Sequence, residues 1–316
     1  MTASTTARTA DPAAQGTGRA TRGGPVRALR RRAVAPPGRG VRRVRQWARG
    51  RRGSAVVRVV RPVLVLAFWL VVWQAAALVV GQRLLLPAPA EVGARFGELV
   101  VEPAFWATVG HSLVRVLSGF VLGTVAGTVL AVTAARWSVV RALVTPLVGA
   151  VRAAPVVSFI ILVLIWVDSG RLAVVVSALM VLPVVFAAVL EGIGRRDVAM
   201  LEVALVFRLP VWRRVRAIDV PAVLPFFAAA CQVGIGLAWK SGIAAEVIGL
   251  PAGSVGERLY DAKLLLETAD VFVWTGVVVA LSLAAERGLG ALLRRVPSAR
   301  GAVAGGGARG RGGGAS

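Results

Sequence analysis

The sequence lacks most of the side chains on which enzyme and metal sites depend. It has one cysteine, Cys231, and one histidine, His111, so it can form no internal disulfide and no cysteine–histidine zinc site. Its only lysines are Lys240 and Lys263, and neither follows a glycine, so the Gly-Lys-Ser/Thr element of a phosphate-binding loop is absent. We therefore expect a chain that is not an enzyme, hydrolyses no ATP itself and needs no metal or cofactor.

Charged residues are also scarce. They make up 17% of the chain, whereas 57% of residues are hydrophobic and the mean hydropathy is +0.74. A soluble domain has roughly 45–50% apolar and about 25% charged residues. The apolar residues gather in blocks of about twenty, which is the length that a helix needs to cross a hydrocarbon core of about 30 Å. The composition therefore predicts an α-helical protein that spans the membrane several times.

The blocks divide the chain into a membrane domain and two tails. We expect an all-α domain of about six transmembrane helices over 56–297. The tails 1–55 and 298–316 are rich in Arg, Gly and Ala, a composition that predicts disorder. The expected spans are 62–80, 112–133, 147–167, 172–190, 224–248 and 271–289.

Glycine recurs at every fourth position of the second expected span, at Gly119, Gly123 and Gly127. Residues four apart lie on one face of a helix, and glycines there let a neighbouring backbone approach closely. This spacing predicts that the second span packs tightly against another helix.

Arginine is distributed unevenly between the two sides of the predicted bundle. Residues 1–61 hold sixteen arginines, no lysine and a single acid. In a six-span arrangement the Arg-rich loops 134–146 and 191–223 fall on the same side as this tail, whereas 81–111 and 249–270 hold more acids than bases. Positively charged loops stay cytoplasmic, so we expect both ends of the chain there. For the tail we expect no nucleic-acid binding; contact with anionic membrane lipid and a simple topology signal remain alternatives.

The segment between the fourth and fifth expected spans has the strongest functional signal. It begins with Glu202-Val203-Ala204, contains Trp212 in the Arg-bearing stretch 208–214, and ends with Pro221 and Pro225. A segment of this length and charge between two spans is suited to docking against a cytosolic partner. It resembles the loop by which binding-protein-dependent permeases of ABC importers engage their ATPase.

In that family the loop begins with Glu-Ala-Ala, has a glycine about four residues later and closes with Leu-Pro. Here Val203 replaces an alanine and Arg208 stands at the glycine position. Glycine adopts a positive φ readily and arginine does so only at a cost, so we expect the usual turn to be disturbed. Either the docking helix is shifted or extended, or the partner ATPase is a divergent one. The coupling residues that the resemblance implies are Glu202, Val203, Ala204, Arg208, Trp212 and Pro221.

The resemblance covers about residues 85–293 and points to the nitrate/sulfonate/taurine branch of these permeases. Its motifs are 86–92, 112–120, 236–240 and 244–249. It implies a type I importer fold in the bacterial inner (plasma) membrane and a small, anionic solute. The implied partners are ATP-binding cassette ATPase subunits, an extracytoplasmic solute-binding protein and a second copy of the chain. Closure of the ATPase dimer would move the loops and switch the path between inward- and outward-open.

Three ionisable residues are candidates for the solute path: Lys240, Glu246 and Arg152. Such groups inside a bilayer are costly and usually face a partner or water. Lys240 and Glu246 are six residues apart, so they do not share one helix face. As alternatives, Lys240 pairs with a carboxylate, Glu246 anchors at the outer interface, and Arg152 reaches the headgroups.

The acidic outer segment 253–270 also has two interpretations. It has leucines among charges, as an amphipathic helix would. Such a helix either contacts a solute-binding protein or packs across the end of the bundle.

Two other functions stay open at this stage. A secondary transporter would predict inverted repeats and several intramembrane acids, and neither is evident in the sequence. A non-transporting membrane scaffold would account for the basic tail and would leave the 202–225 segment unexplained.

Overall fold

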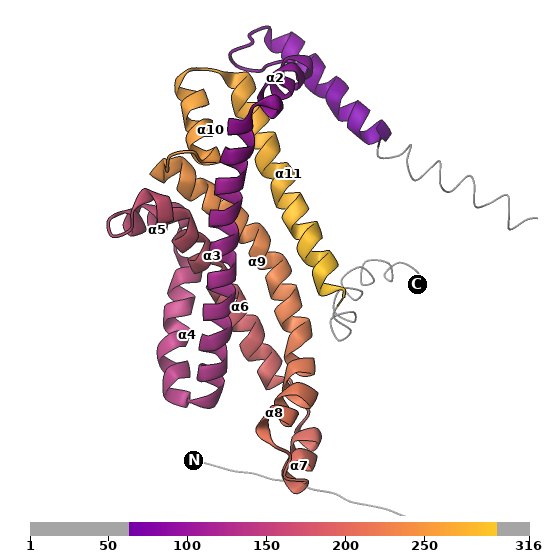
Figure 1. The fold of residues 1–316 in the computed structure, drawn as a ribbon, viewed down its shortest axis with the longest axis vertical. Helices are drawn as coiled ribbons and strands as arrows, with labels where there is room; N and C mark the ends of the chain where they lie inside the picture. Colours follow the sequence, from indigo (N-terminus) through magenta and orange to yellow (C-terminus); the bar gives the residue numbers. More distant parts are fainter. Residues whose placement is uncertain (1–62, 296–316) are drawn as a thin grey trace, which may run out of the picture. The chain divides into compact units, whose positions relative to one another are not determined.

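The computed structural model describes residues 63–295, and within that range all regular structure is helical (Figure 1). Both tails, 1–55 and 298–316, lie outside the described residues. The helices are Val63–Val80, α2 (Pro89–Val101), α3 (Pro103–Arg136), α4 (Ser138–Ala153), α5 (Val156–Leu164), α6 (Ser169–Gly194), α7 (Val198–Val206), α8 (Val211–Arg214), the π-helical turn η1 (Val215–Asp219), α9 (Val220–Gly249), α10 (Val255–Leu264) and α11 (Thr268–Leu293).

Five helical stretches are long and apolar enough to cross a membrane, and the bent pair α4–α5 makes a sixth if it counts as one span. The five are Val63–Val80, α3, α6, the stretch Val211–Gly249 that includes α9, and α11. The expectation of an all-α protein of about six spans is therefore confirmed. The helices extend beyond several expected spans, because polar end turns that hydropathy excludes remain helical.

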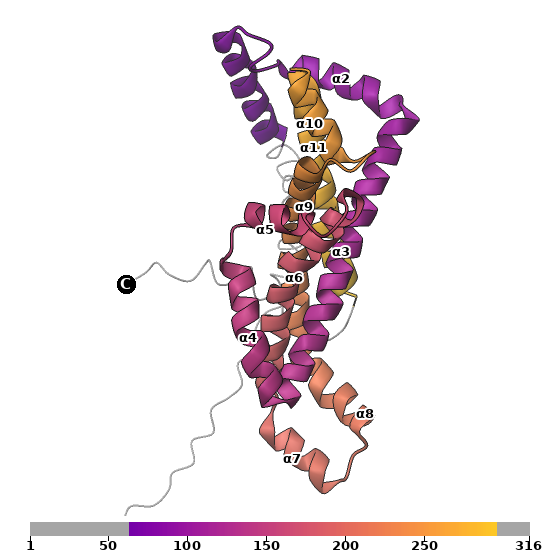
Figure 2. The same ribbon diagram turned by 90° about the vertical axis from the view of Figure 1, so that its left-hand side faces the viewer.

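The third expected span, 147–167, departs from a single continuous helix. It is divided between α4 and α5, whose axes differ by 107°, and Figure 2 shows α5 lying across the bundle while α4 runs along it. The break falls at Ala154, which has an extended backbone (φ −77°, ψ 143°), and at Pro155. A residue before proline is disfavoured in the helical region, and proline has no N–H to continue the hydrogen-bond ladder.

The glycine spacing in α3 marks its contact with α6, as the sequence predicts. A Cβ placed on Gly119 would lie 2.5 Å from the carbonyl oxygen of Val174, and one on Gly123 would lie 2.5 Å from that of Ala178. At Gly127 the corresponding distance, to the carbonyl oxygen of Leu182, is 2.7 Å. No side chain fits at such separations, so the two backbones touch through glycine alone. The predicted close packing of the second span is confirmed.

Helix α9 completes the core by packing against α6 and α11. The Ser177 hydroxyl on α6 donates to the carbonyl oxygen of Ala238 at 2.9 Å. The indole N–H of Trp239, 1% exposed, donates to the carbonyl oxygen of Val278 on α11 at 2.9 Å. These bonds satisfy polar groups that hydrocarbon would otherwise leave unpaired, and they fix the rotation of α9 about its own axis.

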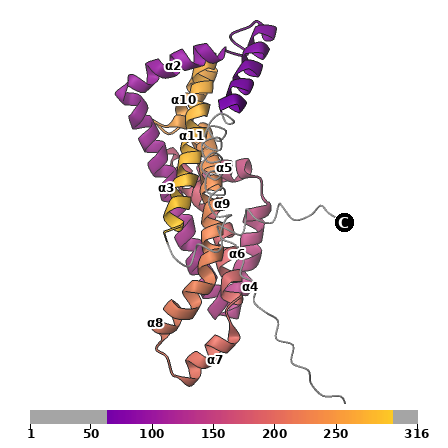
Figure 3. The same cartoon turned by 90° about the vertical axis from the view of Figure 1, so that its right-hand side faces the viewer.

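The two ends of the bundle carry different structures. Helices α7 and α8 lie at one end of α6 and α9, and α2 and α10 lie at the opposite end (Figures 1 and 3). At the α2–α10 end, Arg95 donates through Nε and Nη2 to the Asp270 carboxylate at 2.6 and 3.0 Å. This hydrogen bonding, with a further bond to Glu98, raises the pKa of Arg95 above its usual value. The Arg95 guanidinium therefore stays charged while it joins α2 to α11.

Candidate functional site

The segment between α6 and α9 forms a closed loop of short helices at one end of the helical bundle (Figure 3). Helix α7 begins where the Asp197 carboxylate accepts a hydrogen bond from the Ala199 N–H at 2.9 Å. The loop is closed at its base by Arg196 and Asp219, whose Nη1 and Oδ1 atoms are 2.9 Å apart. Arg196 also donates through Nε to the carbonyl oxygen of Ile193 at 2.7 Å. The loop is therefore anchored to the end of α6 on one side and to the start of α9 on the other.

Arg208 retains the turn that its residue type was expected to disturb. Its φ is +47°, within the left-handed region. The Leu209 N–H donates to the carbonyl oxygen of Ala204 at 2.9 Å, and the Arg208 N–H donates to that of Leu205 at 3.0 Å. This pair of bonds is a Schellman helix end with Arg208 at the position that glycine usually occupies, followed by Pro210. The expectation of a disturbed turn is wrong, because two hydrogen bonds offset the cost of a positive φ; a shift or extension of the docking helix stays a prediction.

The other residues that the sequence suggests for coupling lie along this loop and do not converge on one point. Ala204 is 3% exposed and faces the bundle, whereas Glu202 is exposed and Val203 is 49% exposed. Trp212 is exposed on α8, with the Arg213 guanidinium 5.4 Å from its ring centroid. Pro221 stands in the first turn of α9, directly after the π-helical turn η1. They therefore form a surface rather than a pocket.

That surface is apolar to an extent unusual for an unpartnered loop. Its exposed members are Val198, Met200, Val203, Leu205, Val206, Phe207, Leu209, Val211 and Trp212. Contiguous apolar surface beyond a few hundred Å² marks a contact site or a membrane surface. We refer to these nine residues as the apolar loop surface.

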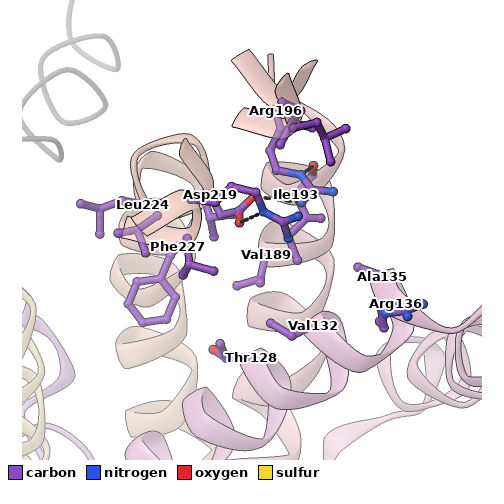
Figure 4. Close-up of a pocket in the computed structure, with 16 residues that line it drawn as sticks. Thr128, Val132, Ala135, Arg136, Val189, Ile193, Arg196, Asp219, Leu224 and Phe227 are labelled. Carbon is purple, nitrogen blue, oxygen red and sulfur yellow. Dashed lines mark hydrogen bonds and ion pairs between the residues drawn. The ribbon is translucent and has the colours of Figure 1, made fainter. Parts of the chain in front are cut away.

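A cavity of about 850 Å³ lies between the loop and helices α3, α6 and α9 (Figure 4). We call it the apolar cavity, because hydrocarbon side chains make up most of its wall. Its charged groups lie at its margin: Arg136 ends α3, while Arg196 and Arg214 flank Asp219. The apolar wall includes Val132, Val189, Ile193, Val223, Leu224 and Phe227.

A second cavity, of about 580 Å³, lies between α3, α4 and α6. Arg141, Thr145 and Arg152 of α4 line it, together with Glu191 and Arg196. Arg141 and Arg152 are eleven residues apart, which places them on one helix face about 16 Å apart along the axis. The Glu191 carboxylate is engaged by Arg195 at 2.8 Å. We call this the basic cavity, because neither Arg141 nor Arg152 has an ion-pair partner in the described part of the chain.

Lys240 is exposed on the free face of α9. It precedes the end of that helix by nine residues, a distance of about 14 Å at 1.5 Å per residue. No carboxylate among residues 63–295 pairs with it. An ammonium group at this depth is costly against lipid. The exposed position of Lys240 therefore favours water or another protein surface, rather than lipid, against this face of α9.

Glu246 is fully buried and joins three helices. Its Oε2 accepts hydrogen bonds from the Ser112 hydroxyl at 2.6 Å and from the Gly256 N–H at 3.3 Å. The Arg115 Nη1 lies 3.7 Å from Oε1. Ser112 in turn accepts from the Val255 N–H at 2.9 Å, so α3 and α9 together cap the start of α10. Its side chain has no exposed surface, so in this structure Glu246 links α3, α9 and α10; its role in the solute path or as an anchor stays a prediction.

Two features of this site escape a reading of the sequence. Arg196 and Asp219 are 23 residues apart, and Ser112 and Glu246 are 134 apart. Pairs so distant along the chain leave no periodic signal. The glycine at position 256 is the one local clue, because a Cβ there would overlap the backbone of Glu246. No cluster of His, Cys, Asp and Glu that could hold a metal ion occurs within the described range.

Comparison with known proteins identifies a family and several relatives. Residues 119–296, more than half of the chain, match the family described as binding-protein-dependent transport system inner membrane component. A probable ABC transporter permease protein of Brucella melitensis is 29% identical over 67% of this chain and 86% of its own length. A putative aliphatic sulfonates transport permease protein of Bacillus subtilis is 25% identical over 69% and 77%. A riboflavin transport system permease protein of Chloroflexus aurantiacus is 26% identical over 68% and 80%.

A solved structure, described as the crystal structure of an amino acid ABC transporter with histidines, has the same fold. The two chains superpose with a TM-score of 0.51 at 16% identity, over 61% of this chain and 94% of the other. At this identity the likeness concerns the fold alone.

Proposed function

Because the chain belongs to the binding-protein-dependent transport system inner membrane component family, we propose that it forms the path of an ABC importer for a small anionic solute. It is an ABC transporter permease of the nitrate/sulfonate/taurine branch and a multi-pass protein of the inner membrane. It is not itself an enzyme, since such permeases rely on a separate ATPase chain.

The basic cavity is the observation that carries the choice of an anionic solute. Arg141 and Arg152 present two unpaired guanidinium groups on one face of α4. The other charged groups of the lining are already paired, Arg196 with Asp219 and Glu191 with Arg195, so the two unpaired arginines set the sign of the cavity. A cleft lined by charge of one sign between low-dielectric walls raises the local concentration of counter-ions. A sulfonate, nitrate or other small anion fits that field. The relative named for aliphatic sulfonates supports this class, whereas the one named for riboflavin shows that family membership alone does not decide it.

Lys240 supports the same interpretation from α9. Its exposed, unpaired ammonium group is compatible with the bilayer only if water or a second subunit covers that face. A second copy of the chain packed with this face inward would make Lys240 part of a shared aqueous path. The residues that we propose to line the path are therefore Arg152, Lys240 and, in addition, Arg141.

The apolar loop surface supports docking of an ATP-binding cassette ATPase subunit. A docking loop transmits force only if it is rigidly connected to the spans. The Arg196–Asp219 pair provides that connection to α6 and α9, and the turn at Arg208 fixes the angle between α7 and α8. In this proposal the loop faces the cytoplasm, in agreement with the arginine distribution of the sequence. Helix α10, at the opposite end, is then available to a solute-binding protein.

Reconstitution tests the proposal directly. The permease would be purified with the ATPase from its native host and placed in proteoliposomes with the binding protein. Uptake of labelled taurine, an alkanesulfonate and nitrate would be measured with ATP inside. We expect ATP-dependent uptake of at least one anion, reduced severalfold by Arg152→Gln. The control is Arg171→Gln, an exposed arginine outside both cavities that pairs with Asp168. Failure of any ATPase to copurify would contradict the importer assignment, and an unchanged rate for Arg152→Gln would contradict the anion path.

A further inference from the structure

The apolar cavity has no role in the transport proposal, yet it has the dimensions of a ligand site. Cavities that hold small ligands measure about 300–1,000 Å³ and are walled mainly by hydrocarbon with a few polar groups, and this one measures about 850 Å³. It is bounded by α3, α6 and α9 and by Leu201 and Leu205 of α7. An occupant would therefore touch both the spans and the loop.

The charged groups at the margin of the apolar cavity favour a bound anion. Arg136 is exposed at the last turn of α3 and has no ion-pair partner in the described part of the chain. The Nε of Arg214 is buried without a hydrogen-bond acceptor, at 3.6 Å from the Asp219 carboxylate. The lining thus contains one carboxylate, that of Asp219, and three guanidinium groups, those of Arg136, Arg196 and Arg214; Asp219 pairs with Arg196 and Arg214 only. Figure 4 shows Arg136 at the edge, apart from the Arg196–Asp219 pair.

The wall and the margin together specify one chemistry, a hydrocarbon chain attached to an anionic head. A soluble anion would leave the apolar wall uncovered, and a lipid with no net charge would leave Arg136 without a counter-charge. In a protein of the inner membrane both parts are supplied by one molecule. We propose that the apolar cavity binds an acyl chain of an anionic phospholipid, with the headgroup phosphate on Arg136. The lipid would hold α7 against α3 and α9 and so stabilise the loop.

Lipid titration of the purified permease tests this without an ATPase or a solute, so its result is independent of the transport proposal. Native mass spectrometry in detergent would compare dioleoyl phosphatidylglycerol with dioleoyl phosphatidylcholine, which has the same chains. We expect tighter binding of phosphatidylglycerol. Arg136→Gln should weaken that binding about fivefold, the effect of one arginine at an anionic lipid surface. It should weaken phosphatidylcholine less, because the choline group offsets the phosphate charge. Arg171→Gln, at the other end of α6, should change neither.

A second pair of variants separates the cavity from the surrounding lipid shell. Val132→Phe fills the cavity from α3 and should reduce retention of phosphatidylglycerol at least as much as Arg136→Gln. Val121→Phe places the same side chain on an exposed position of α3 outside the cavity and should have no effect. Circular dichroism and gel filtration would verify that both variants fold and keep the parent's oligomeric state.

Four results would overturn the proposal. Equal affinity for the two lipids, or full affinity in Arg136→Gln, would remove the headgroup contact. Equally tight binding of glycerol phosphate, which has no acyl chains, would assign the site to a free anion. A change of oligomeric state in Val132→Phe would assign the cavity to an interface between copies of the chain.

Discussion

The guanidinium of Arg196 lies 2.9 Å from the carboxylate of Asp219 and so joins the end of α6 to the start of α9. Twenty-two residues, including α7 and α8, lie between these two, and the pair turns them into a closed loop. Both side chains are partly buried, at 29% and 15% exposed, so water screens the pair only in part. A force on the loop surface therefore reaches two spans of the core at once.

Breaking this pair should uncouple the loop from the spans. We expect Asp219→Asn to lower the solute transported per ATP hydrolysed and to reduce stability by roughly 1–3 kcal/mol, the range for a hydrogen bond between charged groups. The control is Arg171→Gln, which removes an exposed pair with Asp168 outside both cavities and should cost well under 1 kcal/mol. The measurements are the transport-to-hydrolysis ratio in proteoliposomes and thermal unfolding in detergent. An unaltered ratio in Asp219→Asn would show that the pair is not the connection.

Replacing Arg208 by glycine should increase the stability of the protein. A residue other than glycine at a positive φ costs about 1–2 kcal/mol, so Arg208→Gly should stabilise the protein by about 1 kcal/mol, after the added flexibility of the unfolded chain is counted. The same substitution at Arg213, which is helical in α8, should destabilise by a similar amount. Thermal unfolding of the two variants should therefore shift in opposite directions. A shift in the same direction would contradict the strain that the φ of +47° implies.

The α3–α6 contact should not accept a methyl group. We expect Gly123→Ala to cost about 1–3 kcal/mol, because a Cβ at this position overlaps the α6 backbone. Gly110→Ala on the same helix has no atom within 4 Å of its new Cβ and should be neutral or slightly stabilising. Unfolding midpoints of both proteins in one detergent would be compared. Equal midpoints would mean that the α6 backbone moves away and accommodates the added methyl group.

Glu246 and Arg115 should behave as one unit. Truncating one member leaves a buried charge unpaired, so we expect Glu246→Ala to cost about 3–5 kcal/mol. Adding Arg115→Ala should restore part of that loss, giving a coupling energy of about 1 kcal/mol or more in a double-mutant cycle. If Glu246 lined the solute path instead, Glu246→Gln would change the KM for uptake and leave the unfolding midpoint unaltered.

Lys240 should matter for uptake and not for folding. Its side chain is exposed and unpaired within residues 63–295, so Lys240→Gln should change stability by less than about 0.5 kcal/mol. Uptake of anionic solutes should fall severalfold, because a counter-charge is lost from the path. Arg171→Gln, an exposed basic residue outside both cavities, is the control, and it should leave uptake at the level of the parent. Reduced folding in Lys240→Gln would point to a structural partner.

Hydropathy and glycine spacing were sufficient to predict the spans and the α3–α6 contact, because both are local properties of the chain. The break at Pro155 was visible as a residue type, but its 107° bend depends on how α5 packs against α6 and α9. The turn at Arg208 was misjudged because residue preference is a weak term beside two hydrogen bonds and a following proline. The partners of Glu246 could not be predicted, since they come from α3 and α10 and are set by tertiary packing.

The interlocked backbones of α3 and α6 limit where this protein can bend. With no side chain between them at Gly119, Gly123 and Gly127, sliding one helix along the other would force backbone atoms to overlap. The two helices therefore behave as one rigid lever. Hinges must lie at segments free of this interlock, such as the Ala154–Pro155 break and the π-helical turn Val215–Asp219 that leads into α9.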